Sequence, residues 1–186
     1  MIKTSYLLLT IVLFNNALLK AQSNLLLFTK TGEISFFSKA SLEDIQAKNK
    51  NVTSFINTKT KETVVRVPIT QFQFPNKLMQ QHFNENYLES ESYPAATFKG
   101  NIAEVIDFAK PGIYDVTANG TFTLHGVSNK KTLKGKLTIA DNTVKLDSQF
   151  DILLADYKID IPKLVFNKVA EKINITANLS YLPYKK

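Results

Sequence analysis

The side chains that could bind a metal ion gather in one short segment of the sequence. His82, Glu85 and Glu89 are spaced i, i+3 and i+7, so a helix through them would carry all three on one side. Imidazole and carboxylate groups are metal ligands, but no further strong ligand is evident nearby. Because such groups on a helix usually form a solvated face, we predict no metal ion here. We expect Glu85, Glu89 and Glu91 to form an acidic rim or to pair with lysines.

The second histidine, His125, ends a run in which apolar and polar residues alternate. It falls on the polar face of that run, directly before Gly126. One interpretation is that it orients the polar head of a ligand or gates the mouth of a barrel. The other, which its position favours, is a histidine that is hydrogen-bonded at the end of a strand.

Catalytic motifs are absent from the sequence. It contains no G-x-S-x-G, H-E-x-x-H, P-loop or G-x-G-x-x-G pattern. The absence of cysteine excludes disulfides, thiolate metal sites and a Cys nucleophile. Asp151 and Asp156 could flank a sugar bond, but Asp151 lies on the outward face of an amphipathic strand, where charges are expected. We therefore predict a protein that is not an enzyme and needs no cofactor.

The basic residues exceed the acidic ones. The chain of 186 residues carries a net charge of +7 and is 44% hydrophobic, enough for one domain with a substantial core. Lysines gather in one predicted hairpin and at the end of the sequence: Lys130, Lys131, Lys134, Lys136, Lys185 and Lys186. They could draw the protein to anionic head groups or a membrane surface, or keep a strand edge from pairing with other chains, which we favour.

Neither nucleic acid nor a particular oligomer is indicated by the sequence. The aromatic residues follow the hydrophobic alternation instead of lying between the lysines, so we do not expect a nucleic-acid partner. The oligomeric state stays open, with a homodimer as one option.

Alternation of apolar and polar residues, which indicates half-buried strands, dominates the chain. In residues 173–181 every odd position is apolar and every even one polar, and similar runs cover 114–125, 132–139 and 144–152. Turn sequences separate these runs at hairpin spacing. They predict a meander of about four strands over 97–153 and a final strand at 171–182. Earlier strands are predicted at 32–39, 51–57 and 62–74.

One helix interrupts the strands. Residues 75–85 start with proline and carry Leu78, Met79 and Phe83 on neighbouring turns, which predicts a short helix that packs Met79 and Phe83 onto one end of the sheet. The polar stretch 86–94 is predicted to be irregular. Residues 41–48 fit either a short helix opened by a capping box at 41–44 or another strand.

About eight antiparallel strands fit either a sandwich or a closed barrel, and a barrel leaves no exposed edges. An eight-stranded barrel either fills with side chains or holds one small ligand. The inward faces carry small residues between Phe and Leu: Gly100, Ala118, Gly120, Gly135 and Ser148. These residues either leave volume for an apolar ligand or accommodate twist and corners, and the sequence favours neither.

Residues 1–21 have the pattern of a secretory signal peptide. Lys3 supplies the positive charge, 7–14 the apolar run and Ala21 the small residue for cleavage before Gln22. The alternative, a membrane anchor, is disfavoured because the apolar run is shorter than the ~20 residues that a bilayer span needs. We therefore predict a periplasmic or secreted protein with one domain over 22–186.

Two segments resemble the YceI-like family. Residues 72–100, FQFPNKLMQQHFNENYLESESYPAATFKG, resemble its Met-containing helix, H-x-N stretch, acidic step, Tyr-Pro and F-x-G strand, in that order. Residues 120–127, GTFTLHGV, resemble its G-x-L-T-I/L-H-G-V strand. The surrounding strand pattern covers essentially all of residues 22–186.

The resemblance implies an all-β fold, an antiparallel eight-stranded lipocalin-like β-barrel with one short helix. It also implies an elongated apolar pocket for a long amphiphilic isoprenoid, quinone or fatty amide, and no established enzymatic activity. By matching position it places Phe98, Phe122 and Leu124 in the interior, and Met79 and Phe83 at the end covered by the helix.

These observations predict an exported protein that sequesters or carries an isoprenoid, quinone or fatty-acyl lipid. The residues expected to line its apolar pocket are Phe36, Phe74, Met79, Phe83, Phe98, Phe122, Leu124, Leu137, Phe150, Ile173, Ile175 and Leu179. The alternative is a structural or stress-related interaction module of the cell envelope, not an enzyme, with a filled barrel and a functional surface.

Overall fold

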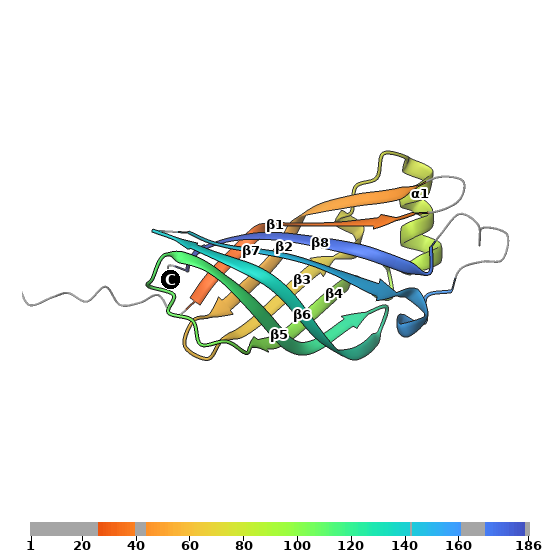
Figure 1. Ribbon diagram of the computed structural model, residues 1–186. Helices are drawn as coiled ribbons and strands as arrows, with labels where there is room; N and C mark the ends of the chain where they lie inside the picture. Colours follow the sequence, from red (N-terminus) through yellow and green to blue (C-terminus); the bar gives the residue numbers. More distant parts are fainter. Residues whose placement is uncertain (1–25, 40–43, 142, 161–169, 185–186) are drawn as a thin grey trace, which may run out of the picture.

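A computed structural model describes residues 26–39, 44–141, 143–160 and 170–184. In this part of the chain eight antiparallel strands form a closed barrel, in which each strand pairs with its neighbours in sequence and β1 closes on β8 (Figure 1). The strands are β1 (Leu26–Ser38), β2 (Ile45–Asn57), β3 (Glu62–Pro68), β4 (Ala95–Ile102), β5 (Gly112–Leu124), β6 (Val127–Ala140), β7 (Thr143–Leu153) and β8 (Lys172–Pro183). The predicted eight-stranded barrel is confirmed, and the two-sheet sandwich is excluded.

The predicted inward faces are confirmed as well. In β8 the odd residues from 173 to 181 are all buried, whereas the even residues between them are exposed or half-buried. The inward residues of β5 and β7 are buried or half-buried, with Phe122 and Ile152 among the buried ones. The side-chain period of two therefore separates the barrel interior from the solvent, as the sequence pattern indicates.

Several predicted boundaries differ from the structure. The first strand begins at Leu26 instead of residue 32, and β2 begins at Ile45, so the described part of the ambiguous segment 41–48 is extended. The predicted strand 62–74 ends at Pro68, because proline has no N–H with which to continue the ladder. The chain then turns through the 3₁₀ helix η1 (Ile69–Gln71). The predicted signal peptide and residues 41–43 lie outside the described residues.

One end of the barrel, which we call the helix end, is covered by the helix α1 (Lys77–His82). The side chain of Asn76 begins the helix by accepting hydrogen bonds from the N–H groups of Leu78 and Met79, at 2.9 and 3.4 Å. The helix continues as the π-helix η2 (Phe83–Tyr87), so the helical segment is shifted by about two residues from the predicted 75–85. The 3₁₀ helix η3 (Leu154–Tyr157) follows β7 at this same end (Figure 1).

The opposite end of the barrel, where β1 begins and β8 ends, is filled with side chains. Val52, Leu137 and Tyr181 are each 0% exposed. The Tyr181 hydroxyl lies 2.8 Å from the Ser54 hydroxyl, which in turn donates to the carbonyl of Val64 at 2.8 Å. Because burial raises the pKa of Tyr181 far above its ordinary range, this phenol stays protonated and the filled end remains uncharged.

Two inward glycines allow the strands of the barrel to approach closely. Gly100 on β4 lies opposite Gly120 on β5, and a Cβ added to Gly120 would lie only 2.7 Å from the Cα of Gly100. None of the five small inward residues named above lines the cavity that the barrel contains. The structure therefore supports the second interpretation of these residues, close packing at bends of the sheet.

Candidate functional site

The helix end of the barrel contains a cavity of about 340 Å³. Its walls come from seven of the eight strands, all except β6, and its cover comes from the segment around α1 and η2 and from the chain after β7. Among the described residues, the side chains at the other end of the barrel are closely packed, so the cavity lies toward the helix end. Its volume lies at the lower end of the range typical for small-molecule sites, about 300–1,000 Å³.

Nine of the twelve residues predicted to line a pocket surround this cavity. Six come from the barrel wall: Phe36, Phe122, Leu124, Phe150, Ile173 and Ile175. Three come from the segment that covers the opening: Phe74, Met79 and Phe83. The alternating pattern located the first six, and the helix pattern located Met79 and Phe83.

The other three predicted residues do not line the cavity. Phe98, Leu137 and Leu179 are 4%, 0% and 2% exposed and belong to the closely packed part of the interior. They face inward as predicted, but the cavity does not extend to them. We therefore leave these three out of the ligand site proposed below.

Aromatic rings form the wall of the cavity next to the helix. The Phe83 ring lies 5.5 Å from Phe36, 5.5 Å from Phe72 and 5.0 Å from Phe74, measured between ring centroids. These separations are typical of favourable aromatic pairs. The Phe83 ring thereby connects the end of α1 to β1 and to the chain that follows η1.

Sequence reasoning missed several residues of the site. Ile34 lies two positions before Phe36 on the same face of β1, so the alternation itself could have located it. Leu88 follows η2 in a stretch of polar residues, and Ile159 follows η3. No periodic signal surrounds these last two, because each enters the cavity from an irregular segment.

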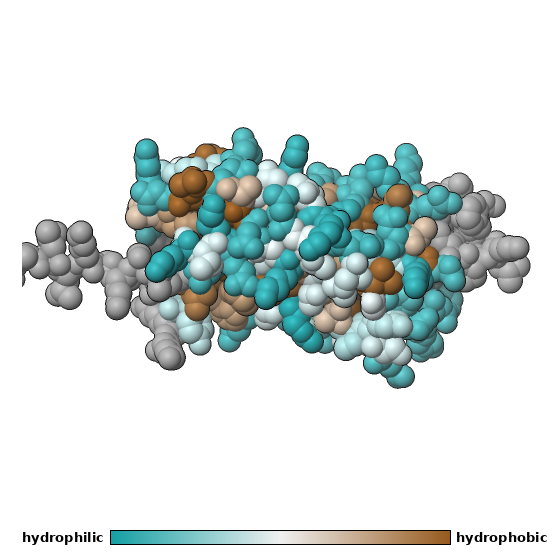
Figure 2. Space-filling view, turned by 90° about the horizontal axis from the view of Figure 1, so that it is seen from below, coloured by the Kyte–Doolittle hydropathy of each residue, from teal (hydrophilic) through white to brown (hydrophobic). Residues whose placement is uncertain are grey.

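The lining of the cavity is almost entirely apolar. Among the described residues that line it there is no Asp, Glu, Lys or Arg, and its polar members are Ser38, Asn76, His82 and Tyr87. Burial raises the pKa of the Tyr87 phenol, which keeps this group neutral. The outer face in Figure 2 shows the opposite character, mostly hydrophilic with small separate apolar patches. The interior of the barrel is therefore better suited to an apolar ligand than the outer face in this view.

The histidine His125 lies in the turn between β5 and β6 and does not line the cavity. Its φ of 50° and the 72° of Gly126 give the tight turn that joins antiparallel strands. Its Nδ1 lies 3.2 Å from the carbonyl oxygen of Tyr157, and its ring packs 4.5 Å from the ring of Tyr93. These contacts support the interpretation of a hydrogen-bonded histidine at a strand end.

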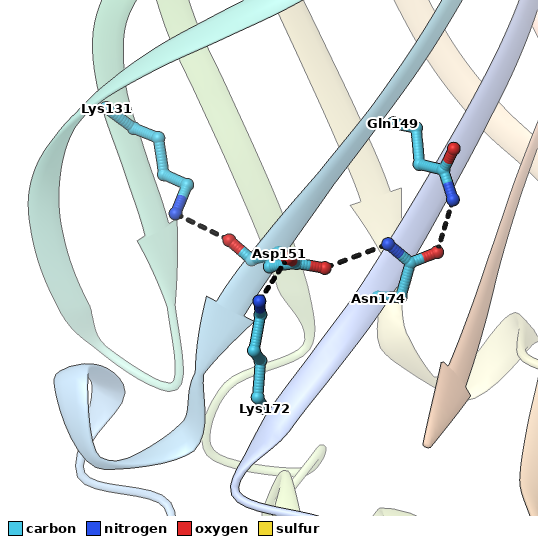
Figure 3. A network of polar contacts seen from close by, with 5 residues as sticks. All are labelled: Lys131, Gln149, Asp151, Lys172 and Asn174. Carbon is cyan, nitrogen blue, oxygen red and sulfur yellow. Dashed lines mark hydrogen bonds and ion pairs between the residues drawn. The ribbon is translucent and has the colours of Figure 1, made fainter. Parts of the chain in front are cut away.

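A polar network bridges β6, β7 and β8 on the outside of the barrel (Figure 3). The Asp151 carboxylate pairs with Lys172 at 2.8 Å and accepts a hydrogen bond from Asn174 at 2.8 Å. Lys131 reaches across from β6 and donates to the backbone carbonyl of Asp151 at 2.8 Å. The Lys172 and Asn174 contacts lower the pKa of Asp151. This carboxylate is therefore part of a structural network, as its predicted outward position indicates.

This network lies where β6 and β7 are no longer paired as a ladder. The ladder between β6 and β7 runs from Ala140↔Thr143 to Gly135↔Ser148 and does not continue toward the helix end. Beyond it, the Lys131 contact and a 2.7 Å hydrogen bond from Asn129 to the carbonyl of Asp156 connect the two sides. Part of the strand edge that carries the lysine cluster is thus unpaired, which fits the favoured role of these lysines.

The structure offers no arrangement for a metal ion in the residues that it describes. These contain no group of three or more His, Asp or Glu side chains that could hold one. His82 lies at the mouth of the cavity, and the Glu85 carboxylate accepts hydrogen bonds from Gln81 at 3.1 and 3.2 Å. Within the same residues, no helix has the length and hydrophobicity that crossing a membrane requires.

Comparison with known proteins gives one family and a set of similar folds. The model of the YceI-like domain family matches residues 21–181. No curated protein matches the chain. Among solved structures, a polyisoprenoid-binding domain from Saccharophagus degradans, implicated in plant cell wall breakdown, has a TM-score of 0.72 at 15% identity, over 86% of this chain and 99% of that one.

Two further structures share the fold. BcnA from Burkholderia cenocepacia has a TM-score of 0.67 at 16% identity, over 80% of this chain and 95% of that one. A YceI protein from Campylobacter jejuni has a TM-score of 0.63 at 15% identity, over 80% and 90%. At these identities the likeness establishes the fold of the barrel and leaves the ligand to be argued from the cavity.

Proposed function

The chain belongs to the family of YceI-like domains, and we propose that it binds the apolar chain of an isoprenoid, quinone or fatty-acyl lipid in the cavity under α1. The observation that carries this proposal is the cavity itself, which is enclosed by aromatic and aliphatic side chains and has no carboxylate, ammonium or guanidinium group among its described lining residues. The domain from Saccharophagus degradans with the same fold is a polyisoprenoid-binding domain, which supports the same class of ligand.

Hydrophobic burial would supply the binding energy. Each CH₂ group that moves from water into the cavity contributes about 0.8 kcal/mol. About ten such groups give roughly 8 kcal/mol in gross terms, before the cost of association is subtracted. The polar head would remain at the mouth, where Asn76 and His82 line the cavity and are exposed.

The cavity argues against the alternative of a completely filled barrel. A structural or interaction module would need no empty volume under the helix, whereas here the far end alone is filled. Binding without catalysis agrees with the apolar lining. We also propose that the protein is exported to the periplasm or secreted, and that residues 22–186 are its domain. That part rests on the sequence of residues 1–21.

Native mass spectrometry of the protein purified without detergent, followed by solvent extraction, tests the proposal. We expect an adduct of a few hundred daltons that extracts as a lipid, or uptake of an added fatty-acyl or prenyl alcohol. A protein that keeps its bare mass and takes up no added lipid would refute the proposed function.

A pair of variants on α1 tests the place of binding. Met79→Glu puts a carboxylate into the cavity lining, and we expect lipid uptake to fall at least tenfold, because the charge loses its hydration there. Lys77→Glu introduces the same residue on the same helix, at an exposed position outside the lining, and should leave uptake unchanged. Equal uptake by both variants would place the ligand elsewhere.

A further inference from the structure

The size of the cavity sets the length of chain that the protein encloses. We propose that the barrel holds about 10–14 carbons of a single apolar chain, and that the remaining carbons of any longer lipid lie outside the mouth beside α1. This inference rests on the proposed function and names its ligand more closely. The matching ligands are a medium-length acyl chain or about two to three isoprene units.

The volume gives the first estimate. A methylene group in a liquid-like environment occupies about the share of one water molecule, roughly 30 Å³. The cavity of about 340 Å³ therefore holds about eleven methylene groups. A chain of twice that length cannot be enclosed unless the barrel interior rearranges.

Below the cavity, buried side chains project into the interior from two strands, Phe98 at 4% exposure and Leu179 at 2%. Phe98 projects from β4, and a Cβ added to Gly120 would lie 2.8 Å from the end of its ring. Leu179 projects from β8, and a Cβ added to Gly32 would collide with its Cδ2 atom. β4 and β8 are four strands apart in the closed barrel, and each of these side chains lies over a glycine of the strand beside its own, Gly120 on β5 and Gly32 on β1.

The layer beneath offers no continuation of the cavity. Val52, Leu137 and Tyr181 are 0% exposed there, and the Tyr181 hydroxyl is already paired with Ser54 at 2.8 Å. Close-packed interiors resist the insertion of even a few extra carbons. A tail that enters from the helix end must therefore stop in the middle of the barrel.

Within the described residues, a longer chain can leave the cavity at its mouth. Leu78 and His82 both line the cavity and are both exposed, with Leu78 57% exposed. Carbons beyond the capacity of the cavity would pass these residues into solvent, where they gain no further burial. The affinity should therefore rise with chain length up to the capacity and then level off.

A series of straight-chain primary alcohols with about 8 to 18 carbons tests this, together with prenyl alcohols of two, three and four units. Each alcohol displaces a fluorescent apolar probe from the intact protein, below its own solubility limit. We expect affinity to rise about fourfold per added carbon and to become constant at about 10–14 carbons. A rise that continues through 18 carbons would overturn the inference and leave the proposed function standing. No binding by any alcohol would refute the proposed function itself.

A matched pair of variants moves the plateau. Ala96→Leu adds three carbons to the cavity lining, where the empty space accepts them, and should shift the plateau to chains about three carbons shorter. Ala95→Leu, the neighbouring residue on the opposite face of β4, should leave the plateau where it is. A plateau that does not differ between the two variants contradicts the assignment of this cavity. The series on the unchanged protein decides the chain length even if a variant fails to fold.

Discussion

The aromatic cluster around Phe83 should hold the helical cover on the barrel, and Phe83→Ala tests that role. α1 has six residues, none of them buried, and a helix of that length is not stable by itself in water. Its position therefore depends on what its continuation contacts. The Phe83 ring makes three aromatic contacts, with Phe36, Phe72 and Phe74, at centroid distances of 5.0–5.5 Å.

The expected loss of stability follows from those contacts. Three aromatic pairs contribute about 0.5–1.5 kcal/mol each beyond their buried area, or about 3 kcal/mol in all at the middle of that range. Truncation of a fully buried Phe costs about 3–5 kcal/mol in general, and since Phe83 is only partly buried the lower end of that range applies. We therefore expect Phe83→Ala to lower the free energy of unfolding by about 3 kcal/mol and the Tm by roughly 6–12 °C.

Urea unfolding followed by circular dichroism measures the loss, since the chain has no Trp to report by fluorescence. Phe37→Ala is the matched control, because Phe37 lies next to Phe36 but points outward and is 40% exposed. We expect it to cost less than about 1 kcal/mol. Amide exchange should accelerate in residues 77–87 of Phe83→Ala and not in the strands of the far end. Equal losses in the two variants would refute the anchoring role of the cluster.

Two further predictions concern the barrel wall. Lys172 and Asn174 lower the pKa of Asp151 below its ordinary 3.8, so its contribution to stability is complete above that pH and is lost as the pH falls through the lowered value. Melting curves from about pH 6 to about pH 2 should show this loss in the wild type, and a weaker acid dependence in Asp151→Asn. Gly120→Ala places a Cβ 2.7 Å from the Cα of Gly100 and should cost about 1–3 kcal/mol by urea unfolding. In Gly112→Ala the nearest atoms to the new Cβ belong to the Tyr114 side chain, at 3.2 Å, and the cost should be clearly less.

The fold could be predicted to a large extent because its main signal is local. Alternation assigns each residue of β5, β7 and β8 to one side of the sheet, and hairpin turns between the runs make successive strands antiparallel neighbours. The helix was predicted for the same reason, from a proline at its start and apolar residues on neighbouring turns. Its shift of about two residues reflects Asn76, whose side chain caps the first turn.

The site could be predicted in part. Phe36, Phe122 and Ile175 line the cavity because they face inward near the helix end. Leu137 and Leu179 face inward by the same pattern but lie in the filled part of the barrel. Alternation has no information about depth along the barrel, so it could not separate the two groups.

The sequence by itself determined which side chains face the interior, that successive strands are antiparallel neighbours, and roughly where a short helix interrupts them. Only the tertiary structure decided which half of the interior is empty, because that depends on the distance between opposite walls and on which side chains meet across it. Phe98 and Leu179, from strands far apart in the sequence, close the middle of the barrel over glycines on the neighbouring strands. The chain length that the protein can enclose is set there, by contacts that no local pattern encodes.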